Sequence, residues 1–560
     1  MLPALSLAQR WLPDRYRRVF LGAFFGGLLA LGLVVLRDFS MPGDEEIQRV
    51  TGEVSLLYVF QQLPASVQQR LLPARAAALL AQKGQQMQLH RYTDRDYGVA
   101  FEMPAAALEQ VLRLHEPRQF FLLRHLLNFL VCVVGIGAFY TIGARRFGSW
   151  RVGLLGALLL VASPRLFADY FNNSKDAVFL ALFTLAVAAA VPVIERPTWR
   201  RTLACALACA LAIDVRIMGV LVPVATVAFV GWRALRGEYP RRTPLLALLA
   251  LYAGALTGLV VIGWPFLWEA PLGNFLVAWR NMSHFRTLGE ILYRGRLVMD
   301  NALPWHYPLV WVGITVPLYV LGLAGLGVLA VAATVARRGT RLYAGAEWQD
   351  LFFLGLGVAP LVAVIGLHSV LYNGWRQLYF VYPMLLLLAL RGLVAAWRYS
   401  PPRATLARYW QPALAVLLGG ALTTTAVQMV RMHPLQNLYF NVLAPAQVER
   451  YYEIDYWSLG QRSGLEWVLA HDARPRITFF SNRMYPTMLG HQLLPPAQRA
   501  RLVPATSTAE ADYFLNTTSC PSPEPALPLL ATLRADGVSY LRVYTPRATP
   551  APRAASRASE

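Results

Sequence analysis

The stretch VFLGAFFGGLLALGLVVL, residues 19–36, decides the kind of fold that this chain adopts. It carries no charged residue and approaches the roughly 20 apolar residues that a helix needs to cross a hydrocarbon core about 30 Å thick. No small-residue cleavage site follows it, and it is preceded by Arg10, Arg15, Arg17 and Arg18. We therefore expect an uncleaved first membrane span whose N-terminal end faces the cytoplasm.

Apolar runs of this kind recur along the chain. Hydrophobic residues make up 56% of its 560 residues, above the content of about 45–50% in soluble domains. Residues 203–230 are too long for one upright helix that rises about 1.5 Å per residue, so we divide them into two short helices around a turn with Asp214 and Arg216. The sequence predicts an all-α polytopic membrane protein with about eleven spans, near 19–36, 120–142, 152–163, 177–194, 203–213, 217–232, 245–263, 308–334, 352–371, 378–396 and 413–430.

The formal net charge of +21 comes almost entirely from arginine, since Lys83 and Lys175 are the two lysines of the sequence. The arginines gather in short segments between apolar runs, which is the positive-inside pattern of a membrane protein and not the basic face of a nucleic-acid-binding protein. We expect no nucleic-acid partner. The four cysteines, of which three lie in apolar runs, predict neither a disulfide framework nor a metal cluster.

Two longer polar stretches interrupt this pattern, and both are predicted outside the cytoplasm. The first is an amphipathic and charged loop, residues 38–119, within a transmembrane domain of residues 1–430. The second, residues 431–545, contains the strand-like runs PRITFFSN, ADYFLNTT and VSYLRVYT and the helical run SGLEWVLAHD, which predict a small α/β domain. The Pro-, Ala-, Arg- and Ser-rich tail, residues 546–560, is predicted to be disordered.

The segment SMPGDEEIQRVTG places Asp44, Glu45 and Glu46 just beyond the outer end of the first span. A solvated start of a loop would explain such a triplet. The alternative is a carboxylate that serves as a base near the membrane surface, where partial desolvation and nearby cations adjust its pKa. Pro42 and Gly43 form a rigid turn that favours a fixed position.

The segment SPRLFADYFNNSKDAVF, residues 163–179, crowds further charges into one short external loop. A helix N-cap explains Asn173 or Ser174, and the helix dipole explains part of Asp176. Neither explains why Arg165, Asp169 and Lys175 accompany them, which favours a functional role for Lys175 or Asp176.

Two later segments add cations and aromatic residues on the same side. In LYNGWRQLYFVYP, Arg376 lies among Tyr372 and other aromatic residues, either as a snorkelling arginine of an aromatic belt or as a clamp for phosphate. In LPWHYPLVW, the candidates for donor binding are His306 and Tyr307, although a belt also accounts for Tyr307. Because acids and cations converge on one face, we expect a site for an anionic group carried by a lipid.

The sequence resembles the glycosyltransferase family 39 group, which includes protein O-mannosyltransferases and the aminoarabinose transferases that modify lipid A. The resemblance rests on GDEEIQRVTG, SPRLFADYFNNSKDAVF, LPWHYPLVW, LYNGWRQLYFVYP, HPLQNLYFN and YEIDYWSLGQRSGLEWV. It implies the membrane fold of that group, called GT-C. The aminoarabinose transferases follow their Asp-Glu pair with Arg-Tyr, whereas this chain has Glu46-Ile47, which argues against lipid A as the acceptor.

The resemblance also implies roles for individual residues. An acidic residue of the first external loop acts as base or positions the acceptor, which corresponds to Asp44, and Glu45 completes the acidic pair. A second acid in the next external loop corresponds to Asp176 or Asp169. Cations that hold the lipid phosphate correspond to Lys175, Arg216 and Arg376.

We therefore predict an inverting glycosyltransferase that moves a sugar from a polyprenyl-phosphate donor to a lipid, glycan or protein acceptor. The resemblance to bacterial members places it in an inner membrane, and the arginine pattern predicts the active site and the C-terminal domain outside the cytoplasm. This scheme requires no cofactor and no metal. The alternative is a multi-pass transporter or lipid flippase, a class in which internal repeats and charges near the middle of the bilayer are common.

Overall fold

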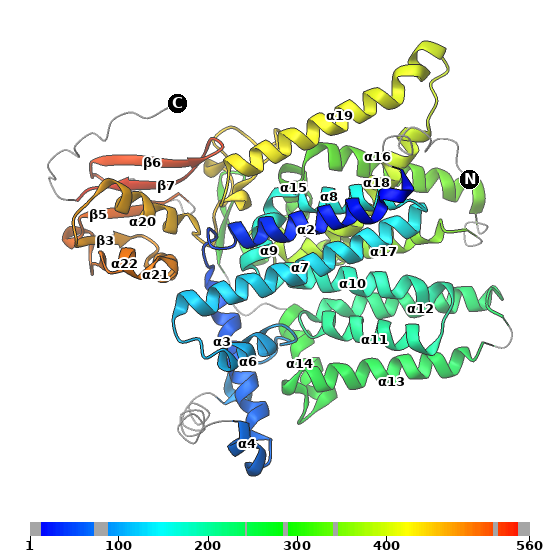
Figure 1. The fold of residues 1–560 in the computed structure, drawn as a ribbon, viewed down its shortest axis with the longest axis horizontal. Coiled ribbons are helices and arrows are strands. Elements are labelled where there is room, and N and C mark those ends of the chain that lie inside the picture. The colour runs from blue at the N-terminus through cyan, green and yellow to red at the C-terminus, as the bar shows by residue number, and fades with distance from the viewer. Residues whose placement is uncertain are drawn as a thin grey trace.

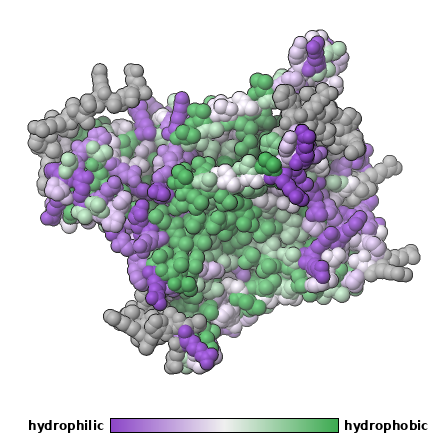
Figure 2. Space-filling model, viewed as in Figure 1, coloured by the Kyte–Doolittle hydropathy of each residue, from purple (hydrophilic) through white to green (hydrophobic). Residues whose placement is uncertain are grey.

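The computed structural model describes residues 13–71, 88–240, 243–283, 289–339, 345–518 and 525–546. Long helices run side by side through most of the molecule, and a small sheet with three helices lies at one end of them (Figure 1). The surface of the long helices forms a hydrophobic band between hydrophilic ends (Figure 2). Such a band matches the apolar layer of a membrane, in which only helices and closed barrels satisfy their backbone polar groups.

Nine helices of the described chain are long and apolar enough to cross a membrane. This finding confirms a polytopic helical membrane protein. They are α2 (Arg17–Val35), α7 (Pro117–Phe147), α10 (Asp176–Glu195), α12 (Leu221–Leu235) continued from η4 (Ile217–Val220), α13 (Leu245–Gly263), α16 (Leu318–Arg338), α17 (Trp348–Gly366), α18 (Tyr382–Arg398) continued from η8 (Arg376–Val381), and α19 (Ala404–Arg431).

Two of the eleven predicted spans are shorter than a membrane requires. Residues 152–163 correspond to α8 (Trp150–Val161), which meets α9 (Pro164–Asn172) at a bend of 74°, so the pair is at most one broken span. Proline at the first position of α9 lacks a backbone N–H and cannot continue the preceding helix. Residues 203–213 correspond to α11 (Trp199–Ile213), which is only about 22 Å long at a rise of 1.5 Å per residue. The count is therefore nine spans, or ten with the bent pair, within the described residues.

The first polar stretch forms helices at the end of the bundle near the sheet (Figure 1). They are α3 (Gly43–Gln61), α4 (Ala65–Leu71) and α6 (Glu102–Val111), with η3 (Leu89–Arg91) between them. The fully buried Arg124 of α7 forms ion pairs with Glu102 and Glu109 of α6, and Arg49 of α3 also pairs with Glu109. Breaking a buried ion pair costs about 3–5 kcal/mol, so this network fixes α3 against the bundle.

The later polar stretches form β1 (Glu290–Tyr293) and β2 (Arg296–Met299), which make a hairpin after α14 (Pro271–Ser283), and a C-terminal sheet. The sheet has the order β4-β3-β5-β7-β6, and β3 is parallel to both β4 and β5, whereas β7 is antiparallel to β5 and β6. The strands are β3 (Ile477–Ser481), β4 (Leu502–Pro504), β5 (Tyr513–Thr517), β6 (Leu529–Ala535) and β7 (Val538–Tyr544), and the helices are α20 (Gly460–His471), α21 (Met484–Leu493) and α22 (Pro496–Arg499). This arrangement confirms the α/β class of the C-terminal part. The predicted disordered tail, apart from Pro546, lies outside the described residues.

The segment between α19 and the sheet packs on the transmembrane helices. The side-chain amide of Asn441 donates to the carbonyl oxygens of Gly313 and Val316, both at 2.7 Å, near the break between α15 (Tyr307–Thr315) and α16. From α20, Arg462 Nη1 donates to the carbonyl oxygens of Arg37 and Phe39, both at 2.9 Å. These contacts join the C-terminal part to the end of the bundle where α3 lies.

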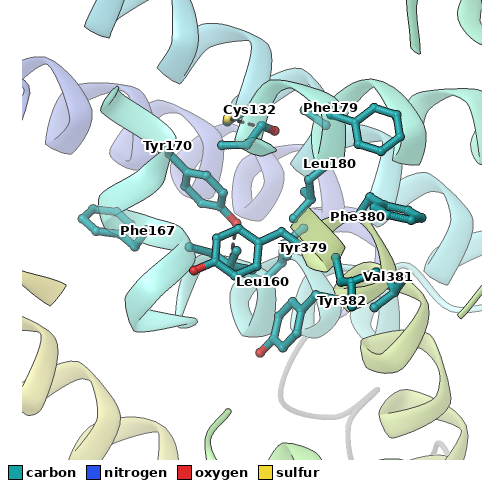
Figure 3. Close-up of a cluster of buried hydrophobic side chains, with 14 of the residues drawn as sticks. Cys132, Leu160, Phe167, Tyr170, Phe179, Leu180, Tyr379, Phe380, Val381 and Tyr382 are labelled. Atoms are coloured by element: carbon teal, nitrogen blue, oxygen red, sulfur yellow. Dashed lines mark hydrogen bonds between the residues drawn. The ribbon is translucent and has the colours of Figure 1, made fainter. Parts of the chain in front are cut away.

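A cluster of buried apolar side chains lies among the helices of the bundle (Figure 3). It brings together side chains of α7, α8, α9, α10 and η8, among them Cys132, Leu160, Tyr170, Phe179 and Phe380. Trp375 and Tyr379 are 3% and 2% exposed, so they belong to this core and not to a lipid-facing aromatic belt. The cluster therefore holds η8, and with it Arg376, in a fixed position.

Candidate active site

Five of the residues singled out in the sequence meet at this end of the bundle. Asp44 lies in the first turn of α3, Lys175 and Asp176 lie at the start of α10, Arg216 follows α11, and Arg376 opens η8. We call this set the charged cluster. Four segments that are far apart in the sequence thus deliver three cations and two carboxylates to one place.

Arg376 is the centre of the charged cluster. Its Nη1 lies 2.9 Å from Oδ2 of Asp44 and 2.9 Å from Oδ2 of Asp176, and its side chain is only 2% exposed. The ring centroids of Tyr372 and Trp457 lie 4.9 and 5.0 Å from its guanidinium carbon. Two carboxylates and two aromatic rings thus surround the guanidinium, as a buried charge requires.

Asp176 is held by a second arginine and by its own helix. Arg216 Nη2 forms an ion pair with Oδ1 of Asp176, whose side chain is 1% exposed. The side-chain oxygen of Asn173 accepts a hydrogen bond of 2.7 Å from the backbone N–H of Asp176, and the Asn173 amide donates to Asp169. Asn173 thus satisfies the first backbone N–H of α10, although the N-cap position itself is Lys175.

Lys175 contributes a cation that no carboxylate neutralises directly. Its ammonium nitrogen lies 3.5 Å from the ring centroid of Tyr97, and no carboxylate of the described chain lies within 4.0 Å of it. Burial, reinforced by the positive charge of Arg216, lowers the pKa of Lys175 from 10.5 to about 8. The lysine is therefore charged at neutral pH but close to its titration range.

Asp44 is accessible from outside the charged cluster, because 36% of its side chain is exposed. Desolvation raises its pKa, but the positive charges of Arg376, Lys175 and Arg216 outweigh that effect, so the pKa of Asp44 lies below its ordinary value. An ionised and accessible carboxylate can accept a hydrogen bond or a proton from a bound hydroxyl group.

The charged cluster has unused capacity for an anion. The Nε atoms of Arg216 and Arg376 are buried and have no hydrogen-bond partner among the described residues. A buried donor without a partner costs about 1–3 kcal/mol. Guanidinium groups offer several donors to one anionic oxygen or to a pair of them, so a phosphate group fits the chemistry of this position.

Three other predicted site residues lie outside the charged cluster. Glu45 is buried and contacts His125 at 3.2 Å, so it faces α7. His306 shares a hydrogen bond of 2.8 Å with the hydroxyl of Tyr293. The hydroxyl of Tyr307 accepts a hydrogen bond of 3.1 Å from the backbone N–H of Gly374, in the loop that leads to Arg376. Tyr307 therefore supports that loop and does not contact the charged groups.

The sequence did not single out Tyr97 or Trp457 as members of the site. Tyr97 belongs to a loop that no motif marks, and its partner Lys175 lies far away in the sequence. Trp457 lies within YEIDYWSLGQRSGLEWV, one of the motifs that carry the family resemblance. In the part of the chain that the structure describes, no three His, Cys, Asp or Glu side chains gather as metal ligands.

The model of the dolichyl-phosphate-mannose-protein mannosyltransferase family matches residues 118–267. This stretch is about a quarter of the chain, and it confirms the predicted resemblance over those residues. It includes Lys175, Asp176 and Arg216, but neither Asp44 nor Arg376. No curated protein matches the sequence.

Solved structures give weaker similarities. ArnT from Cupriavidus metallidurans in the apo state is 14% identical, with 94% of this chain and 98% of that chain covered and a TM-score of 0.46. The same protein bound to undecaprenyl phosphate is 15% identical, with 93% and 98% covered and a TM-score of 0.43. The arabinofuranosyltransferase AftD from Mycobacteria is 12% identical, with 82% of this chain but 36% of that chain covered and a TM-score of 0.37. These values are too low to support an inference about this chain.

Proposed function

We propose that this protein is a membrane glycosyltransferase that takes a sugar from a polyprenyl-phosphate donor. The observation that carries the proposal is the charged cluster: Lys175, Arg216 and Arg376 surround one position at the end of an apolar helix bundle, and Asp44 opens onto it. Such a site suits a phosphate whose long hydrocarbon chain remains in the membrane. The family match, which includes two of these cations and Asp176, supports the same chemistry.

The proposed reaction has one bond-forming and one bond-breaking event. The acceptor hydroxyl attacks the anomeric carbon of the donor sugar, and the bond from that carbon to the phosphate oxygen breaks. The electron pair leaves with polyprenyl phosphate, and the hydroxyl proton passes to the Asp44 carboxylate. Attack opposite the leaving group inverts the anomeric configuration.

The cations act on the leaving group in this mechanism. Arg376 now shares its hydrogen bonds between Asp44 and Asp176, and a bound phosphate would compete with Asp44 for it. That exchange raises the basicity of Asp44 when the donor is in place, because the carboxylate loses part of its positive neighbour. Asp176 keeps Arg216 and Arg376 aligned and is a positioning residue.

The positions of the arginines support one orientation in the membrane. The helix ends far from the charged cluster carry Arg145, Arg146, Arg337, Arg338 and Arg398. The positive-inside rule assigns those ends to the cytoplasm. We therefore propose that the charged cluster and the C-terminal domain face the outside of a bacterial inner membrane.

The C-terminal domain is proposed to cover the site and to select the acceptor. The hydroxyl of Tyr485 in α21 donates a hydrogen bond of 2.6 Å to Glu46, two residues after Asp44. Trp457 lies against Arg376. Side chains of this domain thus lie beside both Asp44 and Arg376.

Donor turnover in nanodiscs tests the proposal. The full chain is incubated with a series of polyprenyl-phosphate sugars and candidate acceptors, and free polyprenyl phosphate is measured. We expect Asp44→Asn to lower the release about 10²–10⁴-fold, which is the usual contribution of a general base. Glu53→Gln, which removes a carboxylate from the same helix at a position paired with Arg49, serves as the matched control.

An unchanged rate in Asp44→Asn would remove Asp44 from the role of base. Movement of the donor across the membrane without any release of polyprenyl phosphate would favour the alternative of a transporter or flippase.

A further inference from the structure

A second charged hollow lies at the opposite end of the bundle from the charged cluster. Its volume is about 540 Å³, and six arginines from the C-terminal halves of α7, α16 and α18 line it. They are Arg145, Arg146, Arg337, Arg338, Arg391 and Arg398. Glu347 is the one acidic residue in its lining within the described chain. We call this hollow the arginine cavity.

Nearby carboxylates neutralise only part of this charge. Asp350 accepts hydrogen bonds from Arg146 at 2.7 and 2.6 Å and from Arg391 at 3.2 Å. Glu347 pairs with Arg338 at 2.8 Å, and Glu195 lies 3.7 Å from Arg145. Three carboxylates therefore face six guanidinium groups, and the described residues provide no ion pair for Arg337 or Arg398.

The usual reasons for arginines at helix ends do not account for a cavity. The positive-inside rule and the dipole at helix C-termini favour arginines there, but both are satisfied by side chains that spread into water. Here guanidinium groups from three helices converge on one hollow. Asp350 holds Arg146 and Arg391, which are 10% and 17% exposed. The more exposed Arg337 and Arg398 lie in the same lining without an ion pair among the described residues. Like charges are brought together in this way where an anion binds between them.

An apolar groove of about 350 Å³ continues from the arginine cavity along the membrane-spanning helices. The two hollows share Phe147, Val394 and Arg398. Along the groove, the walls are made by α8, α18 and α19, with Leu155, Leu393 and Leu418 among the lining residues. Only 6% of the most apolar window of α19 is buried, so most of that window is accessible at the surface of the bundle.

We propose that the arginine cavity binds the headgroup of an anionic phospholipid and that the groove holds one of its acyl chains. A phosphate at the level of the arginines, joined to a hydrocarbon chain parallel to α18 and α19, matches the order of polar and apolar walls. Basic pockets between helices on the cytoplasmic side bind lipids of this class. This site is separate from the charged cluster and does not depend on the proposed glycosyltransferase activity.

Native mass spectrometry of the full chain in detergent tests the headgroup half of the proposal. Phosphatidylglycerol, cardiolipin and neutral phosphatidylcholine are added in turn, and the bound fraction is measured for each. We expect the two anionic lipids to bind and Arg337→Gln/Arg398→Gln to weaken them about tenfold or more, since each surface arginine contributes about 1 kcal/mol toward an anionic lipid. The control Arg200→Gln/Arg408→Gln removes the same charge from exposed positions at the same end of the bundle.

The substitution Gly419→Trp tests the groove. An added side chain at Gly419 meets no protein atom within 4 Å, so it can occupy the groove without disturbing the fold. We expect it to weaken phosphatidylglycerol but to leave the weak binding of inorganic phosphate unchanged. A monodisperse elution profile of each variant shows that it is folded.

Equal binding of phosphatidylcholine, or equal losses in both double variants, would overturn the proposal of a specific anionic site. If inorganic phosphate displaced the bound ligand and Gly419→Trp had no effect, the cavity would bind a free anion and the lipid assignment would be wrong.

Discussion

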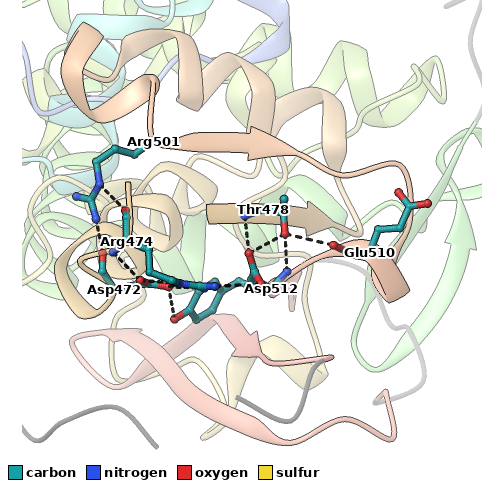
Figure 4. A network of polar contacts seen from close by, with 7 residues as sticks. Asp472, Arg474, Thr478, Arg501, Glu510 and Asp512 are labelled. Carbon is teal, nitrogen blue, oxygen red and sulfur yellow. Dashed lines mark hydrogen bonds and ion pairs between the residues drawn. The ribbon is translucent and has the colours of Figure 1, made fainter. Parts of the chain in front are cut away.

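Two of the networks of aspartate and arginine in the described chain differ in how fully their hydrogen bonds are used. In the C-terminal sheet, Arg474 donates to both oxygens of Asp472 at 3.0 and 2.9 Å and also reaches Asp512 at 3.4 Å (Figure 4). Asp512 in turn accepts the backbone N–H and the hydroxyl of Thr478, both at 2.8 Å. The Arg474 side chain is 46% exposed. In the charged cluster, by contrast, Arg376 is 2% exposed and its Nε has no partner in the described chain.

This difference separates a structural network from one suited to a ligand. The sheet network joins the end of α20 to β3 and to the start of β5, and solvent reaches its open side. The charged cluster buries more positive groups than its carboxylates satisfy, which is unfavourable unless another anion shares the site. We therefore expect substitutions in the sheet network to change stability alone and those in the charged cluster to change donor binding and turnover.

The largest effect is expected for Arg376→Ala. This substitution leaves Asp44 and the buried Asp176 without their common partner, and breaking a buried ion pair costs about 3–5 kcal/mol. The donor phosphate also loses its central guanidinium, so turnover should be abolished. The measurements are thermal unfolding and the release of polyprenyl phosphate, both in nanodiscs.

Arg474→Ala is the matched comparison for Arg376→Ala. Exposed ion pairs contribute about 0–1 kcal/mol, so this variant should unfold near the wild-type temperature and retain turnover. Equal destabilisation by both substitutions would show that burial does not distinguish the two networks.

The next effect is a fall in donor affinity at high pH, which we assign to Lys175. Its pKa of about 8 lies below the ordinary value of 10.5, so donor affinity should fall as the pH rises through about 8 and the lysine loses its charge. Lys175→Arg keeps the charge at all these pH values and should remove the decline. The measurement is the KM for the donor between pH 7 and pH 9.5, and a decline that persists in Lys175→Arg would assign it to another group.

The same shift has a consequence for folding with the opposite sign. Between about pH 8 and pH 10.5 the unfolded chain binds more protons at Lys175 than the folded chain does. The free energy of unfolding therefore rises with pH over this window through this residue, while donor affinity falls. As Lys175 loses its proton, donor affinity therefore decreases while the free energy of unfolding increases.

Much of the fold follows from the sequence because apolar length is a strong constraint in a membrane. Nine of the eleven predicted spans correspond to helices that are long enough to cross. The two exceptions, near 152–163 and 203–213, fail for local reasons: the bend at Pro164 and the shortness of α11. In the sheet, β4 has only three residues, and such a short strand gives no periodic signal.

The candidate site was harder to predict than the fold. Charged residues at the ends of apolar runs are visible in the sequence, which is why Asp44, Lys175 and Arg376 stood out. The sequence does not tell which of two adjacent acids faces the cluster, since neighbouring side chains on a helix point about 100° apart. The structure turns Asp44 toward Arg376 and Glu45 toward His125. Their proposed roles in the reaction stay predictions until turnover is measured.

A small effect is also expected in the sheet network, for Asp512→Asn. Burial opposes the ionisation of Asp512, but the hydrogen bonds from Thr478 and the charge of Arg474 outweigh it, so the pKa of Asp512 lies below its ordinary value. The stability that this group contributes is present above the ordinary pKa of an aspartate and is lost as the pH falls through the lowered value. Asp512→Asn should therefore lower the free energy of unfolding at neutral pH by about 1 kcal/mol, since one hydrogen-bonded acceptor loses its charge. The variant should also lose less stability in acid than the wild type does.

Unfolding of the full chain at pH 7 and at pH 3 checks this prediction. Turnover at pH 7 is expected to stay at the wild-type rate, and a large fall in turnover would connect the sheet network to the charged cluster.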